Sequence, residues 1–107
     1  MNSSNKLALV LCTVPNRATG IDLARALVAA KLAACVNVIE GLTSVYQWQA
    51  DVVEEQEYQL LIKTLPDQLE AAYKLVVSMH PYDLPEWVVL DAHASKDYLN
   101  WMKQALS

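Results

Sequence analysis

Glycine is scarce in this sequence, which has only Gly20 and Gly41 among its 107 residues. A Walker phosphate-binding loop needs two closely spaced glycines and a dinucleotide-binding turn needs three, so neither motif can occur. The sequence also has no GxSxG turn for a nucleophilic serine. These absences exclude the common nucleotide-dependent enzymes, and we expect a protein that is not an enzyme.

Cysteine and histidine are equally sparse. The chain has Cys12, Cys35, His80 and His93, each isolated from the others in the sequence. Structural zinc sites use ligands at short, recognisable spacings, and no such cluster is found. Cytosolic proteins keep their cysteines reduced, so we expect two free thiols rather than a disulfide.

Charge and the length of apolar runs exclude two classes of partner. Eight Lys and Arg stand against twelve Asp and Glu, for a net charge of -4, and no two basic residues are adjacent. Nucleic acid is therefore not expected. The longest apolar runs, such as Leu7 to Cys12, are too short to cross a bilayer. Residues 1–6 lack the charged and apolar regions of a signal peptide, so we expect a cytoplasmic protein with no membrane partner.

Apolar residues are abundant: 54% of the chain is hydrophobic and only 19% is charged. A domain of this size has too little interior to bury all of them. Some of the apolar surface is therefore expected to contact another subunit. We expect residues 1–6 to be disordered and residues 7–107 to form a single domain.

Hydrophobic periodicity distinguishes helices from strands along the chain. Apolar residues at helical spacing predict helices, and β-branched or alternating runs predict strands. Thr19 and Ser95 are expected to cap the first and last helices. The expected strands span residues 7–14, 35–49, 51–64 and 86–94, and the expected helices span residues 20–34, 65–80 and 95–106.

The order of these elements is βαββαβ followed by an extra C-terminal helix. It predicts a ferredoxin-like α+β sandwich, with one antiparallel sheet and helices on one face. The two middle strands form a hairpin with arms of about 14 residues, or roughly 45 Å, against roughly 25 Å for the first strand. We expect this hairpin to overhang the body and pair with a neighbouring subunit. A bulge at Glu40 and Gly41 that splits the arm is the alternative.

The first strand is apolar on both of its faces. A solvated face would carry polar residues, so we expect the sheet face without helices to be buried by a partner. The residues on one face are Leu7, Leu9 and Leu11, and those on the other are Ala8, Val10 and Cys12.

One edge of this predicted sheet gathers possible metal ligands. Cys12 near the end of the first strand, Met79 and His80 at the end of the second long helix, and Glu86 before the last strand would meet there. A thiol, a thioether and an imidazole suit copper, Cu(I) above all. In the alternative interpretation, His80 caps a helix before Pro81, and the two sulfur side chains only fill gaps in the core.

The run from Val52 to Gln59, "VVEEQEYQ", is rich in glutamate and glutamine. This pattern is typical of a strand with one solvated face. We expect the glutamates of this run to be exposed.

Four segments, "LCTVPN", "KLAACVNVI", "HPYDLPE" and "DYLNWM", together resemble the CutA divalent-cation tolerance proteins, and the resemblance extends from Leu7 to Leu106. It implies a homotrimer in which long hairpins pair with the sheet edges of neighbouring subunits, and a role in tolerance of copper and other divalent metals. That trimer is similar to the trimer of the PII signalling proteins. A PII-like regulatory trimer that binds a small molecule or a protein in its subunit clefts is therefore the alternative function.

The resemblance also implies roles for individual residues. Cys12 and His80 take the positions proposed as copper ligands, with Met79 where some relatives have a histidine. Copper is then a possible ligand, and no cofactor is obligatory. The clefts between subunits would collect the side chains of Trp48, Glu57, Lys63, Tyr82 and Glu86.

Overall fold

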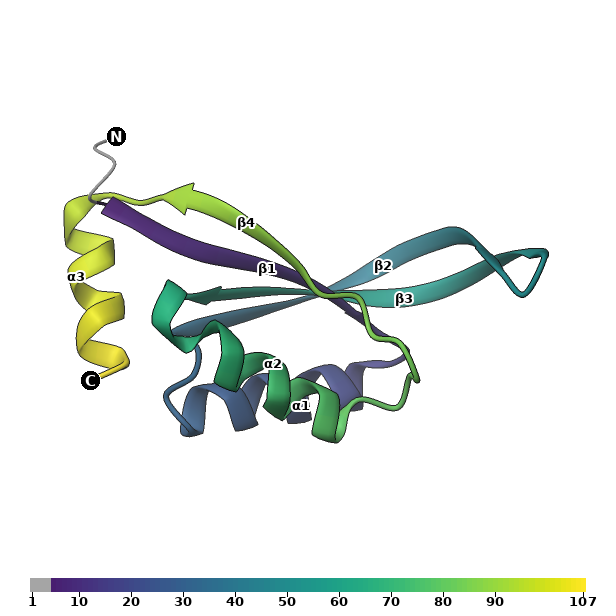
Figure 1. The fold of residues 1–107 in the computed structure, drawn as a ribbon, viewed down its shortest axis with the longest axis horizontal. Coiled ribbons are helices and arrows are strands. Elements are labelled where there is room, and N and C mark those ends of the chain that lie inside the picture. Colours follow the sequence, from purple (N-terminus) through teal and green to yellow (C-terminus); the bar gives the residue numbers. More distant parts are fainter. Residues whose placement is uncertain (1–4) are drawn as a thin grey trace.

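In the computed structural model, which describes residues 5–107, four antiparallel strands form one sheet in the order β2-β3-β1-β4 (Figure 1). Two helices, α1 and α2, lie on one side of it, and a third, α3, lies at the end away from the hairpin tip. This is the predicted ferredoxin-like arrangement. The strands are β1 (Lys6–Val14), β2 (Cys35–Trp48), β3 (Asp51–Thr64) and β4 (Val88–His93), and the helices are α1 (Arg17–Ala29), α2 (Leu69–Met79) and α3 (Lys96–Ala105).

The ends of α1 differ from the prediction. The helix begins at Arg17 because the side chain of Asn16 caps it, accepting a hydrogen bond of 2.9 Å from the backbone N–H of Thr19. Thr19 is therefore inside the helix and is not its cap. The helix ends at Ala29 because Lys31 takes a positive φ of 59°, which turns the chain away. For α3, the predicted cap is confirmed: Ser95 accepts a hydrogen bond from the N–H of Tyr98.

The expected disordered segment is shorter than predicted. The carbonyl of Asn5 accepts a hydrogen bond of 3.0 Å from the N–H of Ala94. Lys6 is already part of β1 and pairs with His93 of β4. These contacts order the two residues, so the prediction of disorder was wrong for them. Residues 1–4 lie outside the described residues.

The main core lies between the sheet and helices α1 and α2. One face of β1 supplies Val10, Cys12 and Val14, all fully buried. Because side chains alternate along a strand, residues two apart share this face. The same core contains Leu60 and Ile62 from β3, Leu23 and Leu27 from α1, and Ala72 and Val76 from α2. None of the helices in the described part of the chain is long and apolar enough to cross a membrane.

The opposite face of the sheet is covered only at one end. There, Leu7 and Leu9 of β1 pack with Leu99 and Met102 of α3. Farther along the same face, the apolar side chains are uncovered: Ile39 is 45% exposed, Val88 44% and Leu90 44%.

The hairpin of β2 and β3 projects beyond the rest of the sheet (Figure 1). β3 pairs with β1 only over residues 58–64, whereas its pairing with β2 continues out to Asp51 and Trp48. A bulge lies between Ile39 and Leu42, where Gly41 has a φ of +85° that a residue with a Cβ rarely adopts. The predicted overhang and its alternative, the bulge, are both present, and the bulge does not end the strand.

Candidate functional site

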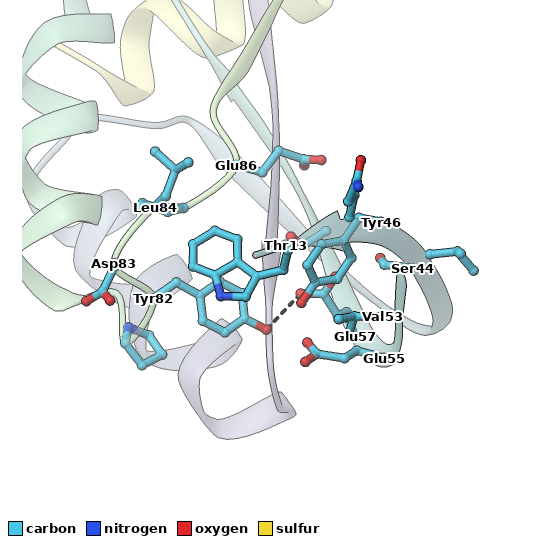
Figure 2. A pocket seen from close by; sticks show the side chains of 15 residues that line it. Thr13, Ser44, Tyr46, Val53, Glu55, Glu57, Tyr82, Asp83, Leu84 and Glu86 are labelled. Atoms are coloured by element: carbon cyan, nitrogen blue, oxygen red, sulfur yellow. Dashed lines mark hydrogen bonds between the residues drawn. The ribbon is translucent and has the colours of Figure 1, made fainter. Parts of the chain in front are cut away.

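A cleft of about 1040 Å³ lies between the projecting hairpin and the loop of residues 80–87, which connects α2 to β4. Side chains from one face of β2 and β3 form its hairpin wall, since residues two apart along a strand point to the same side. The loop forms the other wall (Figure 2). The polar and aromatic lining residues are Thr13, Ser44, Tyr46, Gln47, Trp48, Glu55, Glu57, Tyr82, Asp83 and Glu86.

A hydrogen bond between Tyr82 and Glu57 joins the two walls. The phenol of Tyr82 donates to Oε2 of Glu57 over 2.8 Å (Figure 2). Glu57 is only 6% exposed, so the expectation of a solvated glutamate is wrong at this position. Burial, followed by the hydrogen bond to the Glu57 carboxylate, raises the pKa of Tyr82 above its ordinary value. The loop is thereby connected to β3 through a protonated phenol.

The cleft is strongly acidic. Glu55, Glu57, Asp83 and Glu86 all line it, and the described lining residues include no lysine, arginine or histidine. Within the described part of the chain, the buried Oε1 atom of Glu86 has no hydrogen-bond partner. The carboxylates, with Tyr46 and the other aromatic side chains, offer acceptors and ring faces that complement N–H donors or positive charge.

Cys12 and His80 approach the same backbone atom, the carbonyl oxygen of Thr13. Nε2 of His80 lies 2.8 Å from this oxygen, and Sγ of Cys12 lies 3.8 Å from it. The backbone N–H of Tyr82 donates to Nδ1 of His80 over 3.1 Å. Because Nδ1 accepts this bond, the imidazole proton is on Nε2 and points to Thr13.

The thiol of Cys12 is held in its protonated form. Its side chain is fully buried, and burial is the main reason that its pKa rises from 9.0 to about 12. The negative charges of Glu86 and Glu57 raise it further. A thiol in such surroundings is a poor nucleophile and a poor metal ligand, because both roles require the thiolate.

The predicted copper ligands do not fit a copper ion in this arrangement. Binding would require a thiolate at Cys12 and a free nitrogen lone pair on His80, whose two ring nitrogens are both hydrogen-bonded. Met79 is 40% exposed and does not share the buried surroundings of Cys12. In the described residues, no group of three or more His, Cys, Asp or Glu could hold a metal ion. His80 is the C-terminal cap residue of α2 through its backbone N–H, which donates to the carbonyl of Val76 over 2.8 Å, but its ring bonds to β1 and the loop.

Four of the five predicted cleft residues line this cleft: Trp48, Glu57, Tyr82 and Glu86. Lys63 lies outside it, near the other end of β3, with its ammonium 5.9 Å from the ring centroid of Tyr98 in α3. A place for Lys63 in a cleft between subunits therefore stays a prediction.

Sequence reasoning missed several lining residues. Tyr46 is two residues from the predicted Trp48, and Glu55 is two residues from the predicted Glu57. Each pair shares a strand face, so strand periodicity could have found them. Nothing in the local sequence around Thr13 indicated that its carbonyl would receive His80.

The two cysteines are free thiols, as predicted. Cys12 is on β1 and Cys35 is on β2, and β3 lies between these strands. Strands two positions apart are separated by roughly 9 to 10 Å. A disulfide needs Cα atoms less than about 7 Å apart, so these two residues cannot pair without rearrangement of the sheet.

Comparisons with known proteins give a consistent result. Residues 8–105 match the family model of the CutA1 divalent ion tolerance protein. The chain is 44% identical over 97 residues to the divalent-cation tolerance protein CutA of Thermus thermophilus, covering 90% of this chain and 94% of that protein. It is 41% identical over 106 residues to the Escherichia coli protein of the same name, covering 98% of this chain and 95% of that protein.

Solved structures agree with this result. CutA from Xylella fastidiosa has a TM-score of 0.91 at 34% identity, covering 94% of this chain and 98% of that one. CutA1 from Oryza sativa has a TM-score of 0.91 at 38% identity, covering 95% of this chain and 94% of that one.

Proposed function

Because this chain belongs to the CutA1 divalent ion tolerance protein family, we propose that it acts in the tolerance of divalent cations as a homotrimer. The observation that carries the assembly is the uncovered face of the sheet. We call this surface the open face; its exposed apolar residues are Ile39, Val88 and Leu90.

The open face is too apolar for a surface that stays in water. Ile39, Val88 and Leu90 each expose more than two fifths of their surface, and Leu11 and Leu61 lie between them on the same face. Contiguous apolar surface of this kind marks an interface in soluble proteins. A second copy of the chain would remove it from water.

The edges of the sheet support a ring rather than a two-fold dimer. The edge strands are β2 and β4, which are different surfaces. Contact between β2 of one copy and β4 of the next is heterologous, and such contacts close into rings when the rotation allows. The projecting hairpin extends β2 beyond its own subunit, where it can reach the next one. Three copies is the number that the family resemblance implies.

The assembly is tested by measuring the mass of the native chain and of two variants by analytical ultracentrifugation. Leu90→Lys places a charge on the open face, and Val28→Lys makes a similar change on α1 at a residue that is also 44% exposed. We expect a trimer for the native chain and for Val28→Lys, and dissociation for Leu90→Lys. A native chain that stays monomeric at micromolar concentration would contradict the proposal.

We further propose that copper binds the folded chain only weakly. Cys12, Met79 and His80 supply ligand types that suit Cu(I). Binding would have to ionise a buried thiol whose pKa is about 12 and break a hydrogen bond of His80. The tolerance role would then rest on something other than a preformed copper site in one chain.

The copper proposal is tested by chelator-competition titration of Cu(I) and Cu(II) into the native chain, Cys12→Ser and His80→Ala, with the assembly mass checked for each. We expect weak binding that the substitutions change little. Tight binding that both substitutions abolish, while the assembly persists, would show that these residues form a copper site.

The remaining features of the proposed role come from the sequence. We propose a cytoplasmic protein with no catalytic activity and no obligatory cofactor, whose main partner is a second copy of itself. The alternative, a PII-like regulator with a ligand in its subunit clefts, stays a prediction that no feature of this chain favours over the tolerance role.

A further inference from the structure

The imidazole of His80 is the meeting point of two segments that are distant in sequence. Nε2–H donates to the carbonyl of Thr13 at the end of β1, and Nδ1 accepts the N–H of Tyr82 in the loop. The ring also lies against the Tyr82 ring, with centroids 4.8 Å apart. His80 is buried, at 9% exposure, so these bonds are shielded from water.

The loop lacks the regular backbone hydrogen bonds of a helix or strand, so other bonds must hold it in place. Its second residue is Pro81, which has no N–H and cannot continue α2. Residues 80–87 then form neither helix nor strand before β4 begins. Without a hydrogen bond near its start, few contacts would offset the conformational entropy that the loop loses on folding.

The position of Tyr82 depends on the bonds of His80. Its backbone N–H is held by His80, and its phenol is held by Glu57 on β3. Tyr82 is thus fixed at two points, by the imidazole at its backbone and by the hairpin at its phenol; Figure 2 shows the bond to Glu57. These three hydrogen bonds run in series from β1 through the loop to β3. They therefore set the distance between the loop and the hairpin, which is the width of the cleft.

We propose that His80 acts as a clasp, a neutral imidazole protonated on Nε2 that holds the loop against β1 and so places Tyr82 on Glu57. This role goes beyond the proposed tolerance function and does not depend on it. It also makes the clasp and metal ligation by His80 mutually exclusive. A metal ion on Nδ1 would displace the N–H of Tyr82, and one on Nε2 would displace the bond to Thr13.

The tautomer is the first test, and it uses the native chain. The protein has only two histidines, His80 and His93, so labelling with ¹⁵N-histidine gives two ring systems. His93→Gln assigns them. At neutral pH we expect the His80 ring to show a protonated Nε2 and an unprotonated Nδ1 in long-range ¹H–¹⁵N correlation spectra. A proton on Nδ1, or rapid exchange between the two tautomers, would overturn the proposal.

The second test measures hydrogen exchange at the Tyr82 amide in variants that keep one bond at a time. His80→Asn can place an amide oxygen near the Nδ1 position, whereas His80→Gln can keep a donor near Nε2. We expect exchange about tenfold faster in His80→Gln and His80→Ala, from the loss of one buried hydrogen bond. His80→Asn should stay closer to the native rate.

His93→Gln is the matched control, since it makes the same change elsewhere, and it should leave the Tyr82 amide unaffected. Unchanged exchange in His80→Ala would mean that the loop is held by other contacts, and the clasp would be wrong. If a variant fails to fold, the tautomer of the native chain still decides the proposal, independently of trimer formation and of copper affinity.

Discussion

Replacement of Cys12 by alanine should change how the stability of the protein responds to alkali. Cys12 is fully buried, and its pKa in the folded chain is about 12, against 9.0 for an exposed thiol. Below pH 9 the folded and unfolded chains both keep the proton, so Cys12 adds no pH dependence. Above pH 9 the unfolded chain loses the proton while the folded chain keeps it. Stability is therefore lost as the pH rises from 9 towards 12.

The size of this loss follows from the difference in pKa. At pH 10, ionisation of the unfolded thiol stabilises the unfolded chain by about 1.4 kcal/mol, and each further unit adds about the same amount until pH 12. Cys12→Ala removes the thiol and leaves a small cavity whose cost does not depend on pH. The variant should therefore have a lower free energy of unfolding than the native chain at pH 7. This difference should be about 1.4 kcal/mol smaller at pH 10.

The assay is urea unfolding at pH 7, 9 and 10, at one fixed protein concentration because assembly couples to stability. Cys35→Ala makes the same chemical change at a partly exposed thiol and is the matched control. A difference in unfolding free energy between Cys12→Ala and the native chain that stays constant from pH 7 to pH 10 would show that the buried thiol does not stay protonated. Alkylation of Cys12 by iodoacetamide at pH 8, as fast as that of Cys35, would show the same.

Three further changes can be compared by urea unfolding at the same fixed concentration. Ala50→Gly should stabilise the chain by about 1 kcal/mol, because Ala50 has a φ of +72°; Ala26→Gly inside α1 is its control and should destabilise by about 0.5 to 1 kcal/mol. Gly41→Ala should cost about 1 to 2 kcal/mol through its φ of +85° alone, since no atom lies within 4 Å of the added Cβ. Tyr82→Phe should cost about 1 to 3 kcal/mol because it leaves the buried Glu57 carboxylate without its donor. No change, or a change of the opposite sign, would contradict each of these expectations.

The sequence predicted the architecture well where the signal was local and repeated. Apolar and β-branched runs located the strands. The apolar character of both faces of β1 led us to expect a partner on the face without helices, and that partner stays a prediction. Ser95 directly precedes a helical pattern and was recognised as its cap. Asn16 was missed because the apolar periodicity of α1 becomes clear only a turn later, although its side chain determines where the helix begins.

The candidate site was harder to predict because its geometry depends on contacts between distant residues. Glu57 lies in a polar, acidic run that is typical of a solvated strand face, yet it is buried beside Tyr82 of the loop of residues 80–87. The role of His80 depends on Thr13, which is 67 residues away in the chain. Local sequence could indicate a helix end or a metal ligand at His80, but only the packing of the loop on β1 reveals the bonds of both ring nitrogens.

The proposed homotrimer of this member of the CutA1 family is assembled through the open face of its sheet. Sedimentation equilibrium of the native chain, at several concentrations in the micromolar range, tests it most directly. We expect a single species with three times the mass of one chain. A single-chain mass that persists across the range, with the apolar side chains of the open face left in water, would contradict it.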